Sequence, residues 1–272
     1  MPTNTKKLMR ELVKLSSGAT TKYNKTLLKS YKTALAQVRD EILQLYLKLG
    51  KSKEFAIAAN KLANLEKNIA GLIIDLNADA VNTIRSGTTN IYKINFNGTN
   101  KALAEFGIVN KKAVEASVSN PMRWENALGK YSASLLGGVK QIITNGILTG
   151  EGYEALARKV TERFNISANN AMRILRTEVH RNENAAKLDS INENLFEMRA
   201  QGLNVAKFWI SVVDGRTRDS HIEMNDTQAN ANGIFTFPAG GETEAPGLSG
   251  IPQEDINCRC TIILDFIPDI QN

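Results

Sequence analysis

The amino-acid sequence predicts an α+β protein that is mainly helical, with a long N-terminal helical hairpin and a small C-terminal α+β domain with few strands. Three observations favour this class: two apolar seams with heptad-like spacing in the N-terminal third, renewed helical periodicity after Trp124, and short β-branched and aromatic segments beyond Gly202. The length of 272 residues allows one large domain or two smaller ones. We expect two, a basic α-helical region over 1–120 and an α+β domain over 121–272.

The N-terminal hairpin is predicted from hydrophobic residues that recur at spacings of three and four. Gly50 follows the first seam, where a C-cap glycine is typical, so two antiparallel helices should meet at 49–52. Arms of about 25 residues would each be about 40 Å long. Such a hairpin either reaches a partner or folds onto its own domain. The seams are Leu28, Tyr31, Leu35, Val38, Ile42, Leu45 and Leu49, then Phe55, Ala58, Leu62, Leu65, Ile69, Leu72 and Leu76.

The middle of the chain is predicted to be less regular. Residues 83–120 carry Ser, Thr, Asn and Gly clusters, which indicate a connector with short helices and a domain boundary near 120. Helices follow over 124–150 and 153–164, and after a tight turn at 165–166 Ser167 should cap a helix that reaches about Met198. This last pair resembles a helix-turn-helix, but its second helix is too long for a recognition helix.

Three strands are predicted near the C-terminus. Residues 205–213 are β-branched and aromatic and end at Asp214-Gly215, residues 234–237 alternate and stop at a proline, and 260–264 form the last strand. A Gly- and Pro-rich loop occupies 239–253.

The net charge of +6 is unevenly distributed. Residues 1–120 hold 19 Lys and Arg against 9 Asp and Glu, a surplus of 10, whereas the remainder holds 15 against 19 and is acidic. A basic segment of this kind indicates an anionic partner such as nucleic acid, or long helices that use lysine for solubility.

The sequence also excludes several classes. Two cysteines cannot build a disulfide framework, the first residues lack the apolar stretch of a signal peptide, and no apolar run reaches the roughly 18 residues of a membrane span. We expect a protein made in a reducing cytoplasm, with no membrane span.

Three polar clusters follow one another in the C-terminal half. The first lies on a helix, the second leaves the strand at Trp209, with Asp214 or Thr217 as candidate caps of a following helix, and the third leads into the last strand. They contain Arg173, Arg176, Thr177, Glu178, His180 and Arg181; Asp214, Arg216, Thr217, Arg218 and His221; and Asp255, Asn257, Cys258, Arg259 and Cys260.

Taken in this order, the Arg-Thr-Glu helix, the strand with Trp209, the Asp-x-Arg-Thr-Arg-x-x-His segment, the Phe–Pro loop and the closing Asn-Cys-Arg-Cys resemble the Mu protein F-like head morphogenesis family of tailed phages. The resemblance covers roughly 140–265. It implies a minor capsid protein inside the head near the portal. Its partners would be portal and capsid or scaffold proteins, with non-specific contact to packaged or ejected DNA.

The clustered residues are predicted to form a structural polar core that joins helix, strand and last strand. Arg–Glu pairs commonly serve this purpose. The predicted core consists of Arg176, Thr177, Glu178, Trp209, Asp214, Arg216, Arg218, His221, Asn257, Cys258, Arg259 and Cys260.

A zinc site is an alternative use of part of this set. His180, His221, Cys258 and Cys260 are all the histidines and cysteines of the chain, and two of each can hold zinc tetrahedrally. Cys-x-Cys places both sulfurs on one face of a strand. If His180 is not a ligand, Asp214 or water would complete the site. The other interpretation is two semi-buried thiols, with His221 bonded to a carboxylate such as Glu178.

An enzymatic alternative is a nuclease-like or other hydrolase. Glu178 would be the general base, His221 the acid, and Arg218 would bind a phosphate. No spacing in the sequence is diagnostic of a catalytic class, so the prediction is a binding protein and not an enzyme.

Overall fold

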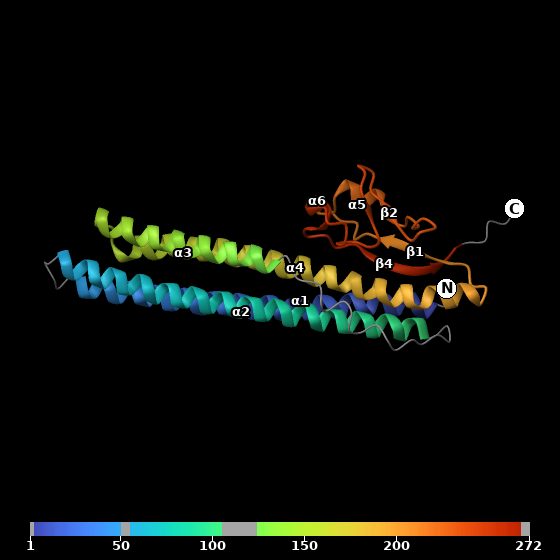
Figure 1. The fold of residues 1–272 in the computed structure, drawn as a ribbon, viewed down its shortest axis with the longest axis horizontal. Coiled ribbons are helices and arrows are strands. Elements are labelled where there is room, and N and C mark those ends of the chain that lie inside the picture. The colour runs from blue at the N-terminus through green and yellow to red at the C-terminus, as the bar shows by residue number, and fades with distance from the viewer. Residues whose placement is uncertain (1–2, 50–54, 105–123, 268–272) are drawn as a thin grey trace. The chain divides into compact units, whose positions relative to one another are not determined.

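The computed structural model describes residues 3–49, 55–104 and 124–267 (Figure 1). Four long helices account for most of these residues, and a small set of short strands and helices follows them. This confirms the predicted mainly helical α+β class. The helices are α1 (Thr3–Leu49), α2 (Phe55–Ala104), α3 (Trp124–Thr149) and α4 (Tyr153–Ala200).

The chain divides into two compact units, which we describe separately. The first unit contains the described residues within 1–21, 86–121 and 175–272, and the second those within 22–85 and 122–174. The predicted boundary near residue 120 lies outside the described residues and stays a prediction.

The second unit consists of four antiparallel helix segments. Asn68 of α2 donates to Glu41 of α1, while on the same helix Asn77 accepts from Ser132 of α3. Further contacts follow in reverse chain order, as antiparallel neighbours require: Thr144 lies 3.4 Å from Glu66, and Arg85 pairs with Glu125 at 2.7 Å. The buried seam of α1, including Val38 and Ile42, faces into this unit. The predicted hairpin of α1 and α2 is therefore present.

Both hairpin helices are longer than the sequence predicted. They span 47 and 50 residues, so the connector expected over 83–120 is wrong as far as residue 104, and residues 105–120 lie outside the described part. The polar residues that indicated turns instead make contacts between helices in the first unit. Asn95 is buried and donates to Ser16 of α1 at 2.8 Å, and Asn100 accepts from Ser190 of α4 at 2.7 Å.

Gly98 has a related explanation. It seemed to mark a turn, but it lies inside α2, where α1 approaches closely within the first unit. A Cβ atom at this position would lie 2.1 Å from Leu12, so only glycine fits against that buried side chain.

The predicted break at 165–166 is also wrong, because α4 is continuous from Tyr153 to Ala200. Ser167 does not cap a helix. It is buried inside α4, and its hydroxyl lies 3.4 Å from the Tyr31 hydroxyl of α1. A serine hydroxyl that has a hydrogen-bond partner inside the helix bundle is satisfied without capping a helix N-terminus.

The strands and short helices of the first unit follow α4. Strand β1 (Val205–Ile210) pairs antiparallel with β4 (Thr261–Phe266), and β2 (Phe235–Thr236) pairs with β3 (Glu242–Thr243), a strand the sequence did not predict. Two short helices lie between them, α5 (Asp219–Glu223) and α6 (Pro252–Asp255).

Strand β1 stops three residues earlier than predicted. The backbone N–H of Ser211 donates to the Asn225 side chain at 2.9 Å instead of to a strand, and Val212 and Val213 are exposed.

The core of this part forms around Trp209, which is fully buried. Phe235 and Phe237 contact its ring edge to face, with centroids 5.5 and 5.7 Å away. Apolar residues of α4 and β4 complete the cluster, among them Leu188, Ile191, Met198, Ile262 and Leu264.

None of the helices in the described part of the chain is both long enough and apolar enough to cross a membrane.

The contact between α3 and α4 in the second unit can be tested at Gly146. A Cβ atom there would lie 2.4 Å from Cδ1 and 2.9 Å from Cγ of Leu156, a fully buried side chain that would have to shift. We expect Gly146→Ala to destabilise the fold by about 1–3 kcal/mol, measured by urea unfolding. Gly137 lies on the same helix with open space around it, so Gly137→Ala should stabilise by about 0.5–1 kcal/mol. Equal effects of the two substitutions would contradict this packing.

Candidate functional site

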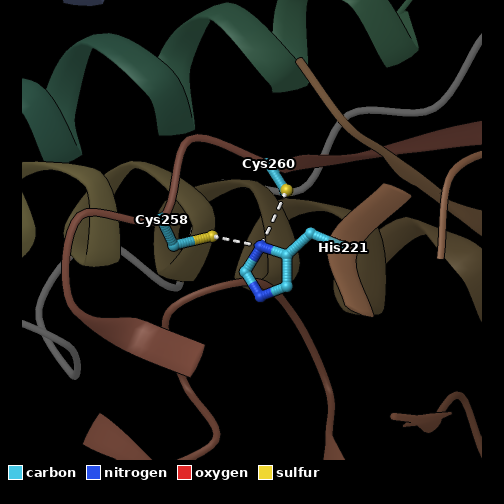
Figure 2. Close-up of side chains that lie close together, drawn as sticks. All are labelled: His221, Cys258 and Cys260. Carbon is cyan, nitrogen blue, oxygen red and sulfur yellow. Dashed lines mark hydrogen bonds between the residues drawn. The ribbon is translucent and has the colours of Figure 1, made fainter. Parts of the chain in front are cut away.

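Three side chains from distant parts of the first unit meet beside the start of β4. His221 comes from α5, whereas Cys258 and Cys260 come from the segment that enters the strand. The Nδ1 atom of His221 lies 3.3 Å from Sγ of Cys260 and 3.7 Å from Sγ of Cys258 (Figure 2). All three residues are buried, and their donor atoms lie within 4.8 Å of one another. We call them the His–Cys–Cys cluster.

The imidazole of His221 is held from several sides. Its Nε2 lies 2.9 Å from Oε2 of Glu254, Phe237 stacks on the ring at 6.0 Å, and Trp209 meets it edge to face at 5.6 Å. Burial lowers the pKa of His221, but hydrogen bonding to Cys260 and the charges of Cys260 and Glu254 outweigh burial and raise the pKa overall.

The two thiols differ in acidity. Hydrogen bonding to Cys258 lowers the pKa of Cys260 to about 4 against the effect of burial, and His221 and Ser211 contribute further hydrogen bonds. The same hydrogen bond between the sulfurs, together with burial, raises the pKa of Cys258. Of the two thiols, Cys260 is thus the one whose surroundings lower the pKa.

Ser211 connects the cluster to the aromatic core. Its hydroxyl donates to the backbone carbonyl of His221, accepts from Nε1 of Trp209 at 3.1 Å, and lies 3.5 Å from Sγ of Cys260. The sequence analysis missed this residue. Ser211 lies two residues after Trp209, so in an extended segment both side chains would lie on one face. This spacing was the only sequence signal for Ser211, and it is the same for any serine in a strand.

Arg218 fixes the segment before the cysteines. Its guanidinium donates to the backbone carbonyls of Glu254 and Ile256, so it anchors α6 instead of facing open solvent as a phosphate ligand would. Ser220 also donates to Glu254, at 3.1 Å. Glu254 thus holds both His221 and Ser220, a role that the sequence analysis did not assign to it.

Asp214 pairs with Arg259 in a bidentate contact of 2.7 and 2.5 Å. The prediction that Asp214 or Thr217 caps the next helix is wrong, because Arg218 occupies the N-cap of α5 without a side-chain bond. Asp214 instead accepts from the N–H of Arg216, whose own side chain is exposed. Hydrogen bonds from Arg259 and from that backbone group hold the pKa of Asp214 well below its usual range.

Part of the predicted polar core does not join this site. Arg176 is exposed, and Glu178 lies 3.8 Å from Arg181 of the same helix. The carboxylate that meets His221 is Glu254 and not Glu178. Thr177 does contribute, because its hydroxyl accepts from the backbone of Asn257 at 3.2 Å.

Asn257 adopts φ 57°, a left-handed conformation that asparagine tolerates well. His180 lies apart from the His–Cys–Cys cluster. It contacts Glu183 and Asn184 instead.

A buried ion pair on α4 contacts the start of β4. Nζ of Lys187 lies 2.8 Å from Glu183 and 2.7 Å from the Thr261 hydroxyl, and Asn184 donates to the Cys260 carbonyl at 3.0 Å. The sequence analysis did not single out these residues, because Glu and Lys four positions apart usually form a solvent-exposed pair on a helix.

A small cavity of about 10 Å³ opens against the cluster, with room for about one water molecule. Its lining joins the end of β1, α5 and the cysteine segment. The residues are Val212, Arg216, Thr217, Arg218, His221, Asn257, Cys258, Arg259 and Cys260.

Comparison with known proteins shows which family this region resembles. Residues 138–263 match the family described as Phage Mu protein F like protein, the family that the motifs of this region predicted. The matched residues include the His–Cys–Cys cluster, Trp209 and the whole of α4.

Two curated proteins are similar to the chain. Minor head protein GP7 of Bacillus phage SPP1 is 28% identical over 273 residues, which cover 93% of this chain and 85% of that protein. An NAD(+)–arginine ADP-ribosyltransferase EFV of Enterococcus faecalis is 31% identical over 141 residues, 52% of this chain but only 28% of that protein. No solved structure matches the chain significantly.

Proposed function

We propose that this chain is a minor head protein of a tailed bacteriophage and acts in head morphogenesis. One observation carries the proposal: the similarity to the minor head protein of phage SPP1 extends over 93% of this chain and 85% of that protein. The similarity thus includes the long N-terminal helices as well as the region of the Mu F-like family. The role is one of binding within an assembly.

We further propose a place inside the head near the portal, with portal and capsid or scaffold proteins as partners. The two parts of the chain would have different roles. The residues around Trp209 supply a stable core, whereas the basic segment 1–120, with its surplus of 10 positive charges, supplies contact surface. Spread lysines of this kind also suit non-specific contact with DNA phosphates, an interaction that weakens steeply as salt rises.

The arrangement of side chains favours a binding protein over an enzyme. Glu178 lies beside Arg181, Arg218 donates to two backbone carbonyls, and His221 faces two sulfurs and Glu254. These three residues therefore do not form the acid, base and phosphate-binding group that a hydrolase needs. The ADP-ribosyltransferase relative is matched over only 28% of its own length, so we do not propose its activity for this chain.

Assembly tests this function directly. We expect the chain in purified heads of the phage that encodes it, in few copies relative to the portal protein, counted by quantitative mass spectrometry. Heads made without it should be defective in assembly or infectivity. Its absence from heads, together with normal heads after deletion, would refute the proposal. DNA binding that does not weaken with salt would remove the DNA contact alone.

A further inference from the structure

We propose that His221, Cys258 and Cys260 bind a zinc ion. This site is independent of the proposed head function, since it concerns how the first unit holds its last strand. The inference rests on the geometry of the donor atoms, the partners of the histidine, the burial of the sulfurs, and the adjacent cavity.

The donor atoms stand close to the positions that a zinc ion requires. Tetrahedral zinc with bonds of about 2.0 Å to nitrogen and 2.3 Å to sulfur separates its ligand atoms by about 3.5–3.8 Å. Here Nδ1 of His221 lies 3.3 Å from one sulfur and 3.7 Å from the other, and no pair in the cluster exceeds 4.8 Å. Small side-chain rotations of the two cysteines suffice to close the site. Figure 2 shows both sulfurs turned toward the same ring nitrogen.

The histidine has the outer partner that zinc ligands typically have. Nε2 of His221 lies 2.9 Å from the Glu254 carboxylate, so this nitrogen carries the proton and donates it. In the neutral ring, the lone pair of Nδ1 then points between the two sulfurs. Carboxylate–histidine–metal arrangements of this kind fix both the tautomer and the ring orientation. Phe237 and Trp209 restrain the ring further.

The sulfurs lie where a free thiolate is costly. Cys258 is 4% exposed and Cys260 is 1% exposed, so neither sulfur has bulk water to stabilise a negative charge. A bound divalent cation would neutralise both thiolates, and soft sulfur ligands together with an imidazole select zinc among common cellular metals. The Cys-x-Cys spacing brings both sulfurs to one side of the segment that enters β4.

The fourth position belongs to water. No fourth Asp, Glu, His or Cys joins the cluster within the described part of the chain, and His180 contacts Glu183 and Asn184 instead. The cavity of about 10 Å³ touches all three ligands and accommodates about one water molecule. The site is therefore three protein ligands plus a water, and it ties α5 to the start of β4.

Zinc content of the full chain tests the proposal. The protein is purified under reducing conditions without chelator or histidine tag, and zinc is counted by inductively coupled plasma mass spectrometry. We expect about one zinc per chain, loss of zinc in Cys260→Ser and in His221→Ala, and full retention in His180→Asn, the matched control. Cobalt substitution should give thiolate charge-transfer absorption that Cys258→Ser weakens.

A milder variant separates binding from folding. Glu254→Gln keeps all three ligands and the side-chain shape, and loss of the outer carboxylate should weaken zinc affinity about 10–100-fold in a chelator competition. Wild-type affinity in this variant would overturn His221 as a ligand.

Two results would overturn the site as a whole. One is wild-type protein that contains no zinc and takes up none under reducing conditions. The other is an intact mass that shows Cys258 and Cys260 joined as a disulfide in freshly purified protein. Neither result would affect the proposed function in the phage head.

Discussion

Replacing Lys187 with methionine is expected to lower the free energy of unfolding by about 3–5 kcal/mol at neutral pH, because it leaves a buried carboxylate without its partner. Lys187 is 2% exposed, and its ammonium group contacts the buried carboxylate of Glu183 and the half-buried hydroxyl of Thr261. Methionine matches the length of the aliphatic stem, so the loss is electrostatic and not one of volume.

The pH dependence should identify the cause. Burial alone would raise the pKa of Glu183, but Lys187 and His180 lower it to about 2, below the usual 4.5. A lowered pKa contributes stability that is complete above about pH 4.5 and is lost as the pH falls toward 2. In Lys187→Met, burial raises the pKa of Glu183, and the carboxyl group takes up a proton. The difference in free energy of unfolding between this variant and wild type should therefore become smaller below about pH 4.5.

Urea unfolding at pH 7 and pH 4 measures both effects. Tryptophan fluorescence in a Trp124→Phe background reports on Trp209 alone, which is buried in the same unit. Arg181→Met is the matched control on the same helix, because the contact of Arg181 with Glu178 is 3.8 Å and the arginine is 38% exposed. Arg181→Met should lower the free energy of unfolding by no more than about 1 kcal/mol.

A double variant gives the opposite expectation. Glu183→Leu combined with Lys187→Met removes both charges together, and it should be close to wild type or more stable, since neither charge then needs a partner. If the single variant Lys187→Met matched wild type at both pH values, the ion pair would have no role in holding β4.

The sequence identified the elements whose signal is local. The aromatic run around Trp209 is bounded by Asp214-Gly215, so β1 was placed within three residues of its end. The His–Cys–Cys cluster was also within reach, because a chain with so few histidines and cysteines offers few combinations. The helical seams predicted the hairpin for the same reason, since their periodicity is read from neighbouring residues.

What the sequence missed depends on partners far along the chain. Asn95 indicated a turn only because its partner, Ser16, is far away in the sequence. Gly98 indicated a turn because Leu12, the side chain that it packs against, is similarly distant in the sequence. Polar and small residues favour turns when exposed, but a helix tolerates them where another helix satisfies or covers them. Glu254 was overlooked in the same way: nothing near it in sequence reveals that His221 lies 2.9 Å away.

The second large effect is expected at Trp209, where substitution by alanine should cost about 3–5 kcal/mol. The indole is fully buried, contacts Phe235, Phe237 and His221 through ring edges, and donates to Ser211. Alanine leaves a cavity between β1 and the aromatic cluster and removes the donor to the Ser211 hydroxyl. That hydroxyl also contacts the His221 carbonyl and Cys260, so the loss should reach the cysteine segment.

Hydrogen–deuterium exchange localises this effect. In Trp209→Ala, peptides covering β1 and β4 should exchange much faster than in wild type, whereas peptides from α3, in the second unit, should be unchanged. Trp209→Phe keeps an aromatic ring but loses the N–H, so its free energy of unfolding should lie between the values of wild type and Trp209→Ala. Uniform acceleration across α3 and the strands would show that Trp209 supports the whole chain and not one unit. Wild-type exchange in β1 and β4 would contradict the central packing role of the indole.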